Sequence, residues 1–235
     1  MTARTEPRDR DLAAVAALLA EPARAAMLDA LAGGIALPAG ELARRAGVHP
    51  ATASSHLRRL VGGQIVRVRP QGRHRYYELA GPQVAAVLEA LARIAPPKAV
   101  SSLREHNTAL ALAEARTCYD HLAGRRGVEL RDRLLEVGAL RELDPRDHEL
   151  TRRGRELLVR LDIEAERLTG GRRIFARSCL DATQRRPHLA GALPAALTAR
   201  LLELGWLARA GGRTLSVADD YVQRLDRWLS GRTAA

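Results

Sequence analysis

The chain has 235 residues, 46% of them hydrophobic but only 3% aromatic, which allows one or two domains with an aliphatic core. Ala and Leu favour helices, so we expect a mainly α fold with short β-hairpins. No apolar run approaches the roughly 20 residues of a membrane span. The N-terminus lacks the apolar stretch of a secretory signal, and two cysteines make no disulfide framework. A cytoplasmic protein without membrane contact is therefore expected.

The formal net charge of +11 is unevenly spread along the chain. Between Leu42 and Tyr77 there is no Asp or Glu, yet this segment holds eight arginines. A solvated surface usually mixes both signs, so the segment predicts a polyanionic partner. Codon bias explains why Lys98 is the only lysine, but it does not explain the missing carboxylates.

The first 62 residues read as four helices. The pattern predicts a helix over Leu12–Leu19 and a second one that starts at Pro22 and ends before Gly33. A short helix over Glu41–Ala46 is followed by a tight turn at Gly47, and a new helix begins near Pro50. Two short helices joined by such a turn form a helix-turn-helix.

The second helix of this motif has one apolar and one polar face. Ala53, Leu57 and Leu60 are expected to face the core. Short hydroxyl and imidazole side chains suit base edges, whereas arginines reach phosphates. The polar face is therefore predicted to consist of Thr52, Ser54, Ser55, His56, Arg58 and Arg59.

A predicted β-hairpin follows in the stretch QIVRVRPQGRHRYYELA, which alternates apolar and polar residues on both sides of Pro70–Gly72. Its tip is basic, and a helix-turn-helix with a basic hairpin makes a winged helix. An amphipathic helix in GPQVAAVLEALARI then ends before Pro96.

The stretches ELARRAGVHPATASSHLRRL and GRHRYYELA together resemble the DNA-binding core of the ArsR-type winged-helix repressors, over roughly residues 10 to 95. The resemblance implies a homodimer that pairs through its first and last helices, here Leu12–Leu19 and Val84–Ile94, and binds a double-stranded, pseudo-palindromic operator. The expected DNA-contacting residues are Thr52, Ser54, Ser55, His56, Arg58, Arg59, Arg67, Arg69, Arg73, His74 and Arg75.

The chain departs from the metal-sensing members of that family, which carry ligands on the first helix of the helix-turn-helix or on the last helix of the domain. Here these helices read ELARRAG and PQVAAVLEALARI, without Cys or His. No resident cofactor is expected there, and any sensor site is predicted to lie in the second half of the chain.

The second half contains an internal repeat. The phrase ARTCYDHLAG (Ala115–Gly124) returns as ARSCLD, then HLAG, within Ala176–Gly191, and Leu130–Glu142 returns as Leu197–Arg209, 67 positions later. We predict a winged-helix domain over 1–97 and a C-terminal effector or dimer-supporting domain over 104–235. The latter is read as two duplicated helix–hairpin–helix units, about 104–165 and 172–232.

The repeated phrases also resemble a subset of ArsR-type regulators with an extra C-terminal region; where versions of that subset have Trp after the second Cys-x-Asp, this chain has Ala182. Cys118 and His121, at i and i+3, are expected on one helix face. With Cys179 and His188 they would form an S₂N₂ set for zinc or another thiophilic ion. The two thiols could instead form a reversible disulfide.

Other interpretations of the repeated phrase stay open. Free cysteines often pack as small apolar groups, and the HLAG phrase is compatible with a helix C-terminus that ends in Gly. Asp120 and Asp181 are expected either to orient an imidazole or to pair with Arg116 and Arg177. An organic effector pocket is a further alternative.

Taken together, the sequence predicts a DNA-binding transcriptional regulator, a repressor released by a small-molecule or metal effector. The alternatives are a thiol or metal sensor at Cys118 and Cys179, an architectural DNA-binding protein, and an enzyme with a Cys nucleophile and a His base. The sequence shows no oxyanion-hole motif or phosphate loop, so we expect no enzymatic activity.

Overall fold

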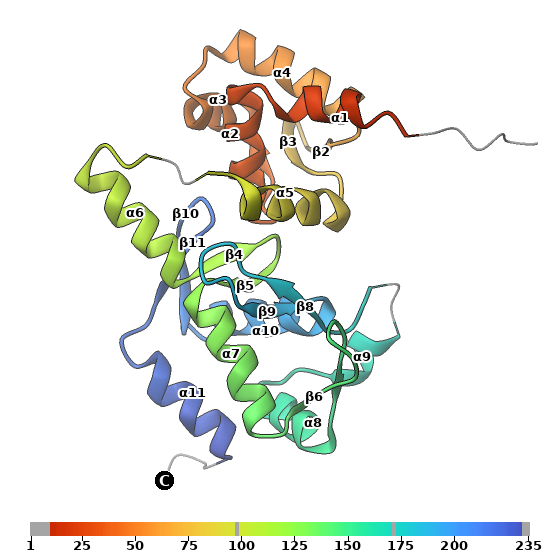
Figure 1. The fold of residues 1–235 in the computed structure, drawn as a ribbon, viewed down its shortest axis with the longest axis vertical. Coiled ribbons are helices and arrows are strands. Elements are labelled where there is room, and N and C mark those ends of the chain that lie inside the picture. Colours follow the sequence, from red (N-terminus) through yellow and green to blue (C-terminus); the bar gives the residue numbers. More distant parts are fainter. Residues whose placement is uncertain (1–9, 97–98, 171–172, 232–235) are drawn as a thin grey trace, which may run out of the picture. The chain divides into compact units, whose positions relative to one another are not determined.

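The computed structural model describes residues 10–96, 99–170 and 173–231, which divide into two compact units (Figure 1). By their contacts, residues up to Leu31 and Ile35–Val84 form the first unit, and Ala32–Gly34 and the chain from Ala85 onward form the second. The boundary thus falls within helix α5 (Pro82–Ile94). In the described part of the chain, no helix is both long and apolar enough to cross a membrane.

The first unit follows the predicted order of helices and strands. Gly47, at φ +65°, ends α3 in the left-handed conformation, and α4 begins at Pro50, whose fixed φ suits a first helical position. The helix-turn-helix is therefore α3 and α4. The elements of the unit before α5 are α1 (Leu12–Leu19), α2 (Pro22–Leu31), β1 (Leu37–Pro38), α3 (Ala39–Ala46), α4 (Pro50–Gly62), β2 (Val66–Gln71) and β3 (His74–Leu79).

The wing is an antiparallel hairpin of β2 and β3, in register from Val66–Leu79 to Gln71–His74. Strand β1 adds to the other edge of β3, which gives the sheet order β1-β3-β2. Gly72 turns the chain at the tip with φ +57°. The predicted winged helix-turn-helix is confirmed.

The second unit is a mixed fold of helices and short strands. The order helix, hairpin, helix, hairpin, helix occurs twice, first from α6 and then from the short helix α9. The first series is α6 (Leu103–Glu114), β4 (Arg116–Cys118), β5 (His121–Ala123), α7 (Arg125–Glu136), β6 (Leu140–Glu142), β7 (His148–Leu150) and α8 (Arg152–Val159). The second is α9 (Ala165–Thr169), β8 (Arg177–Leu180), β9 (Pro187–Ala190), α10 (Ala192–Glu203), β10 (Leu207–Gly211), β11 (Thr214–Val217) and α11 (Tyr221–Ser230).

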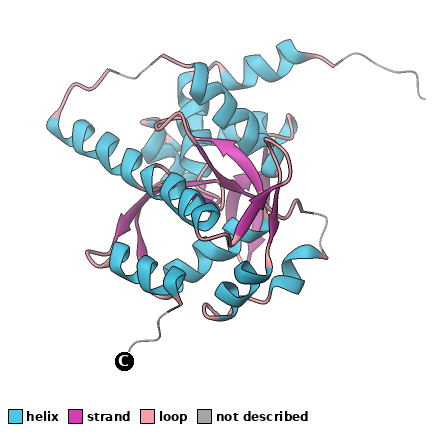
Figure 2. Ribbon diagram, turned by 60° about the horizontal axis from the view of Figure 1, so that its bottom comes forward, coloured by secondary structure: helices cyan, strands magenta, loops and turns pink. Residues whose placement is uncertain are grey.

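The helices and hairpins of the two series pack across one another. Helix α7 packs on β9 of the second series, and α10 packs on β5 of the first. Strands β10, β11, β4 and β5 form one sheet, whereas β6–β7 and β8–β9 are separate hairpins. Figure 2 shows the strands in magenta and the helices in cyan. Leu130 and Leu134 of α7 share one buried core with Leu197 and Leu201 of α10.

The hairpins β4–β5 and β8–β9 correct the sequence prediction, which placed Cys118 and His121 on a helix. Tyr119, at φ +60°, and Asp120 reverse the chain between two three-residue strands. The HLAG phrase also does not end a helix, because Gly124 is the N-cap of α7. At its φ of +77° a Cβ atom would lie 2.9 Å from the carbonyl oxygen of Ala113, so only glycine fits.

Candidate functional site

The outer face of α4 carries the polar residues that the sequence singled out. Ala53, Leu57 and Leu60 are fully buried, as predicted. Thr52, Ser54, Arg58 and Arg59 are exposed, and Ser55 is half-buried. The Ser54 hydroxyl donates to the carbonyl of Pro50 at 2.9 Å.

His56 differs from its neighbours on α4, because its ring is half-buried against α2. Its Nδ1 lies 3.5 Å from Oε2 of Glu21 and 3.4 Å from Nη1 of the buried Arg24. Arg24 also donates to the carbonyls of Ala17 and Leu18, at 2.7 Å each. One nitrogen of His56 is thus occupied by contacts inside the unit.

The arginines of the acid-free segment fall into two groups. Arg67 on β2 donates from Nε to Oε1 of Glu78 on β3 at 2.7 Å. Among the described residues, no carboxylate lies within ion-pair distance of Arg58, Arg59, Arg69, Arg73 or Arg75, which are all exposed. His74 and Arg75 lie on β3, next to the tip of the wing.

The second candidate site lies within the second unit, where the two Cys–His hairpins meet. Cys118 is the cross-strand partner of His121, and Cys179 is that of His188. The four ligand atoms all lie within 4.8 Å of one another. The structure therefore brings together the predicted set of four, although by strand pairing and not by helical spacing.

The two imidazoles of this Cys/His cluster face each other. Their Nε2 atoms are 3.3 Å apart, and the rings stack at 28° with centroids 5.2 Å apart. Nδ1 of His121 lies 3.4 Å from Oδ1 of Asp120, and Nδ1 of His188 lies 3.7 Å from Oδ2 of Asp181. Each ring thus points one nitrogen at a carboxylate and the other at its counterpart.

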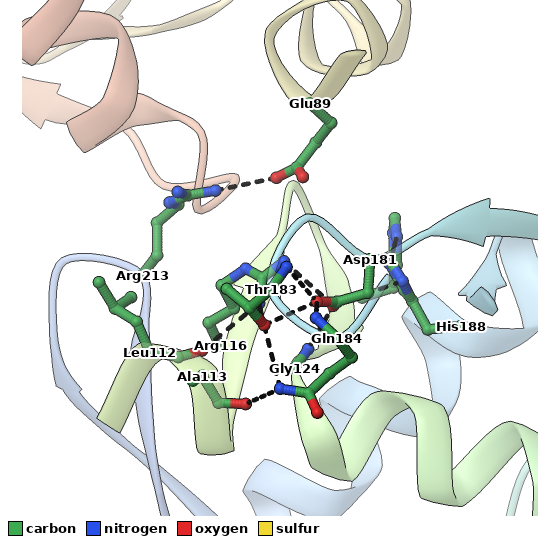
Figure 3. Close-up of polar contacts among 11 residues, drawn as sticks. Glu89, Leu112, Ala113, Arg116, Gly124, Asp181, Thr183, Gln184, His188 and Arg213 are labelled. Atoms are coloured by element: carbon green, nitrogen blue, oxygen red, sulfur yellow. Dashed lines mark hydrogen bonds and ion pairs between the residues drawn. The ribbon is translucent and has the colours of Figure 1, made fainter. Parts of the chain in front are cut away.

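Asp181 is the centre of a buried polar network (Figure 3). Its Oδ2 accepts from Nη2 of Arg116 at 3.0 Å and from the Gly124 N–H at 2.7 Å, and its Oδ1 accepts from the N–H groups of Thr183 and Gln184. Burial raises the pKa of Asp181, but Arg116 and these hydrogen bonds hold it well below its usual value. The carboxylate is therefore ionised and fixed beside His188.

Asp120, the carboxylate beside His121, is bound by Arg173. Its two oxygens accept from Nη1 and Nη2 of Arg173 at 2.6 and 2.7 Å. Although burial raises the pKa of Asp120, hydrogen bonds from His121 and Arg173 lower it to about 2. Asp120 and Asp181 thus each place a carboxylate beside the Nδ1 atom of one ring of the cluster.

The two thiols differ in character. The hydrogen bond between them, followed by burial, raises the pKa of Cys118. The same hydrogen bond lowers the pKa of Cys179 well below its usual value despite burial, and hydrogen bonds to His121 and His188 add to this effect. For His121, burial lowers the pKa, but Asp120 and Cys179 outweigh it and raise the pKa. The two pKa values are thus shifted in opposite directions.

The sequence left open a pairing of Asp120 and Asp181 with Arg116 and Arg177, and the structure pairs Asp181 with Arg116 of the other repeat. The other residues that hold the carboxylates were missed. Arg173, Thr183 and Gln184 were not singled out. The stretch DATQ (Asp181–Gln184) did carry a signal, because Asp followed two residues later by Thr is typical of an Asx turn. Arg177 does not pair with Asp120, which binds Arg173 in its place.

A surface pocket of about 720 Å³ on the second unit is lined in part by chain neighbours of Cys179 and His188, but by none of the four cluster residues themselves. It is bordered by Arg131, Glu142, Leu143, Asp144, Pro145, Arg146, Ser178, Leu180 and Pro187. The pocket is a wide depression with mixed charges, so it presents no convergent set of polar groups comparable to the cluster.

Comparison with known proteins gives a consistent set of matches. A family model described as a helix-turn-helix domain matches residues 19–69. A protein of Bacillus subtilis (strain 168), YdfF, described as an uncharacterized HTH-type transcriptional regulator, is 44% identical over 199 residues, which span 85% of this chain and 88% of that protein. That match is longer than either unit, so the similarity extends into both.

Solved structures match over a shorter part of the chain. The cadmium sensor CmtR of Mycobacterium tuberculosis is 31% identical and covers 40% of this chain and all of its own, with a TM-score of 0.31. The homodimeric winged helix-turn-helix domain of Mb0332 from Mycobacterium bovis is 31% identical over 39% of this chain and 86% of its own, at a TM-score of 0.33. NolR of Sinorhizobium fredii is 29% identical over 35% of this chain and 81% of its own, with a TM-score of 0.33.

Proposed function

Because this chain belongs to the HTH-type transcriptional regulators, we propose that it is a homodimeric repressor that binds operator DNA through α4 and the wing and is released by an effector of the second unit. The observation that carries the proposal is the basic surface formed by the outer face of α4 and by the wing, where five exposed arginines have no carboxylate within ion-pair distance among the described residues. Regulators of this class act by binding DNA and are not enzymes, so no catalytic role is assigned to Cys118 or Cys179.

The DNA-binding surface divides into base-reading and phosphate-binding residues. Thr52, Ser54 and Ser55 lie on the first half of α4, which in a helix-turn-helix enters the major groove. Arg58 and Arg59 follow on the same helix and, with Arg69, Arg73, His74 and Arg75 of the wing, bind phosphates or the minor groove. His56 and Arg67 contribute less, because Glu21 and Glu78 already hold them.

Dimerisation is supported by apolar residues that have no core to fill within one chain. Helix α1 buries none of its residues, and its Leu12 is 78% exposed. On α5, Val87, Leu91 and Ile94 are exposed as well. A two-fold dimer formed through α1 and α5 would cover these side chains and present two recognition helices to a pseudo-palindromic site.

We further infer that the second unit arose by duplication of one hairpin–helix–hairpin–helix segment. Corresponding residues make corresponding contacts in the two series: the N–H of His148 donates to the carbonyl of Ala176, and the N–H of Leu215 donates to that of Ala115, both at 3.0 Å. Likewise, an antiparallel β-bridge joins Asp147 to Arg177, and the corresponding backbone pair in the other series is Thr214 with Arg116. The equivalent Cys–His hairpins of the two series meet in one cluster, which supports a single effector site there.

The proposed function is tested by DNA binding to the protein's own promoter region, measured by fluorescence anisotropy over a series of salt concentrations. We expect preference over scrambled DNA of the same length and an affinity that falls steeply with salt, because arginine–phosphate contacts release counterions. Equal affinity for both DNAs at every salt concentration would instead identify an architectural DNA-binding protein.

A further inference from the structure

We propose that Cys118, His121, Cys179 and His188 bind one thiophilic divalent cation, of the zinc and cadmium type, in a tetrahedral S₂N₂ site, and that this cation is the effector. The site itself stands on the geometry of the second unit. Its regulatory role rests on the proposed function, since a metal can release DNA only from a protein that binds DNA.

The spacing of the two imidazoles is that of a tetrahedral pair. A tetrahedral zinc site has metal–nitrogen bonds of about 2.0–2.1 Å, which places two nitrogen ligands about 3.3 Å apart. The Nε2 atoms of His121 and His188 are 3.3 Å apart. With both thiols within 4.8 Å of these atoms, small rotations of the cysteine side chains complete the coordination shell.

The placement of the two rings favours a cation between them. The carboxylates of Asp120 and Asp181 face the Nδ1 atoms of His121 and His188 at 3.4 and 3.7 Å. Each Nε2 faces that of the other ring, which is the arrangement of two imidazoles that share one metal ion. A carboxylate behind a metal-bound histidine is also the usual arrangement that fixes the ring and strengthens it as a ligand.

The chemistry of the donor atoms selects the metal. Two cysteine sulfurs and two imidazole nitrogens suit zinc, cadmium or cobalt, whereas magnesium and calcium require oxygen ligands. Binding as thiolates displaces the thiol protons to solvent. His188 and Cys118 are buried, His121 is 5% exposed and Cys179 is half-buried, so the site is preformed within the protein and reachable from the side of Cys179.

The hairpin that supplies two of the ligands also holds other segments of the second unit. The N–H of Tyr119 donates to the carbonyl of Ala32 at 2.7 Å, and that of Thr117 donates to the carbonyl of Arg213 at 2.8 Å. Arg213 in turn donates from Nη1 to Glu89 of α5 at 2.9 Å (Figure 3).

These contacts connect the metal-binding hairpin to the segment that carries the DNA-binding residues. Ala32 directly follows α2, before the winged-helix segment Ile35–Val84, and accepts a hydrogen bond from the hairpin. Glu89 lies in α5, after that segment, and is bound by Arg213, whose carbonyl accepts from the hairpin. A cation that fixes this hairpin therefore acts on the two points where the DNA-binding segment is anchored. The metal lowers DNA affinity because it binds the DNA-free state of the dimer more tightly than the DNA-bound state.

The site is tested with Co²⁺, added anaerobically to the reduced, chelator-treated full-length protein and followed by absorption. We expect one Co²⁺ per chain, with the visible bands of tetrahedral cobalt and a near-ultraviolet thiolate charge-transfer band, both removed by Zn²⁺. Cys179→Ser and His121→Gln lose or strongly weaken these bands. His106→Gln, which changes an exposed histidine of α6, is the matched control and retains them.

A positioning role for Asp120 gives a second measurement that does not depend on losing a ligand. Asp120→Asn keeps the cobalt spectrum but lowers metal affinity by about 10- to 100-fold, as loss of a carboxylate behind a metal-bound histidine does. Circular dichroism verifies that each variant is folded.

Three results would overturn the proposal. An unchanged cobalt spectrum in a folded Cys118→Ser/Cys179→Ser variant would place the metal elsewhere. Absence of the thiolate band in the wild type, with a Cys118–Cys179 disulfide formed readily in air, would make the pair a redox switch. Cobalt bound at the four residues without any change in promoter affinity would leave a structural metal and remove the regulatory role.

Discussion

The two units of this protein differ in how they use charged residues. In the winged-helix unit, five exposed arginines of α4 and the wing have no carboxylate within reach among the described residues. In the second unit most of the described arginines pair with acids, and Arg116 does so in the interior, where it is 2% exposed. Unpaired surface cations suit a large polyanion that arrives from solvent, whereas buried and fully bonded groups preorganise a small site.

The largest expected effect breaks the interior network. Asp181→Ala leaves the Arg116 cation buried without its partner and the Gly124 N–H without an acceptor, so we expect a loss of about 3–5 kcal/mol of unfolding free energy. Asp226→Ala removes an exposed partner of Arg133 and is expected to cost less than about 1 kcal/mol. Urea denaturation followed by circular dichroism measures both. Equal losses would contradict the distinction between interior and surface pairs.

A smaller effect is expected at the wing, where two neighbouring arginines on one face of β2 form a matched pair. Arg69→Ala removes a cation that has no described carboxylate partner, so DNA affinity should fall about tenfold. The slope of log affinity against log salt concentration should decrease in magnitude by about one. Arg67→Ala removes a cation that Glu78 already neutralises and should change affinity less than about twofold. Anisotropy titrations at several salt concentrations compare them, and a larger effect of Arg67→Ala would reverse our assignment.

The smallest effect concerns the pH dependence of stability. Burial, and next the Arg131 cation, lower the pKa of His148 below its ordinary value of 6.5, so the folded state binds a proton less readily than the unfolded chain does. His148 therefore destabilises the fold as the pH falls below about 6.5, by at most about 1.4 kcal/mol per pH unit, and has no effect at higher pH. His148→Gln should reduce the stability difference between about pH 7.5 and pH 5.5. If unfolding free energy depends on pH in the same way in this variant and in the wild type, folding does not lower the pKa of this ring.

The first unit was predictable because its signals are local. Pro22 and Pro50 begin helices, Gly47 ends one, and the alternation around Pro70–Gly72 marks the wing. The contacts of His56 with Glu21 and Arg24 were not predictable, since they join residues of different helices.

In the second unit the repeat was visible but the geometry was not. Arg116–Cys118 and His121–Ala123 are three-residue strands buried on both faces, so they lack the alternation that identifies a strand. Their turn is made by Tyr119 and Asp120, without the Gly or Asn that usually marks a tight hairpin. The sequence could name the four cluster residues because both copies share them, but only long-range pairing decides that the two hairpins meet.

The most direct test of the account compares promoter affinity of the wild-type protein with and without one equivalent of Zn²⁺ per chain, at a single salt concentration. We predict that Zn²⁺ weakens binding by about 5- to 150-fold, the usual range of allosteric coupling, and that the Cys118→Ser/Cys179→Ser variant binds the same DNA without responding to Zn²⁺. Equal affinity of the wild-type protein in both conditions, or an equal response of the double variant, would contradict the assignment of the Cys/His cluster as the effector site.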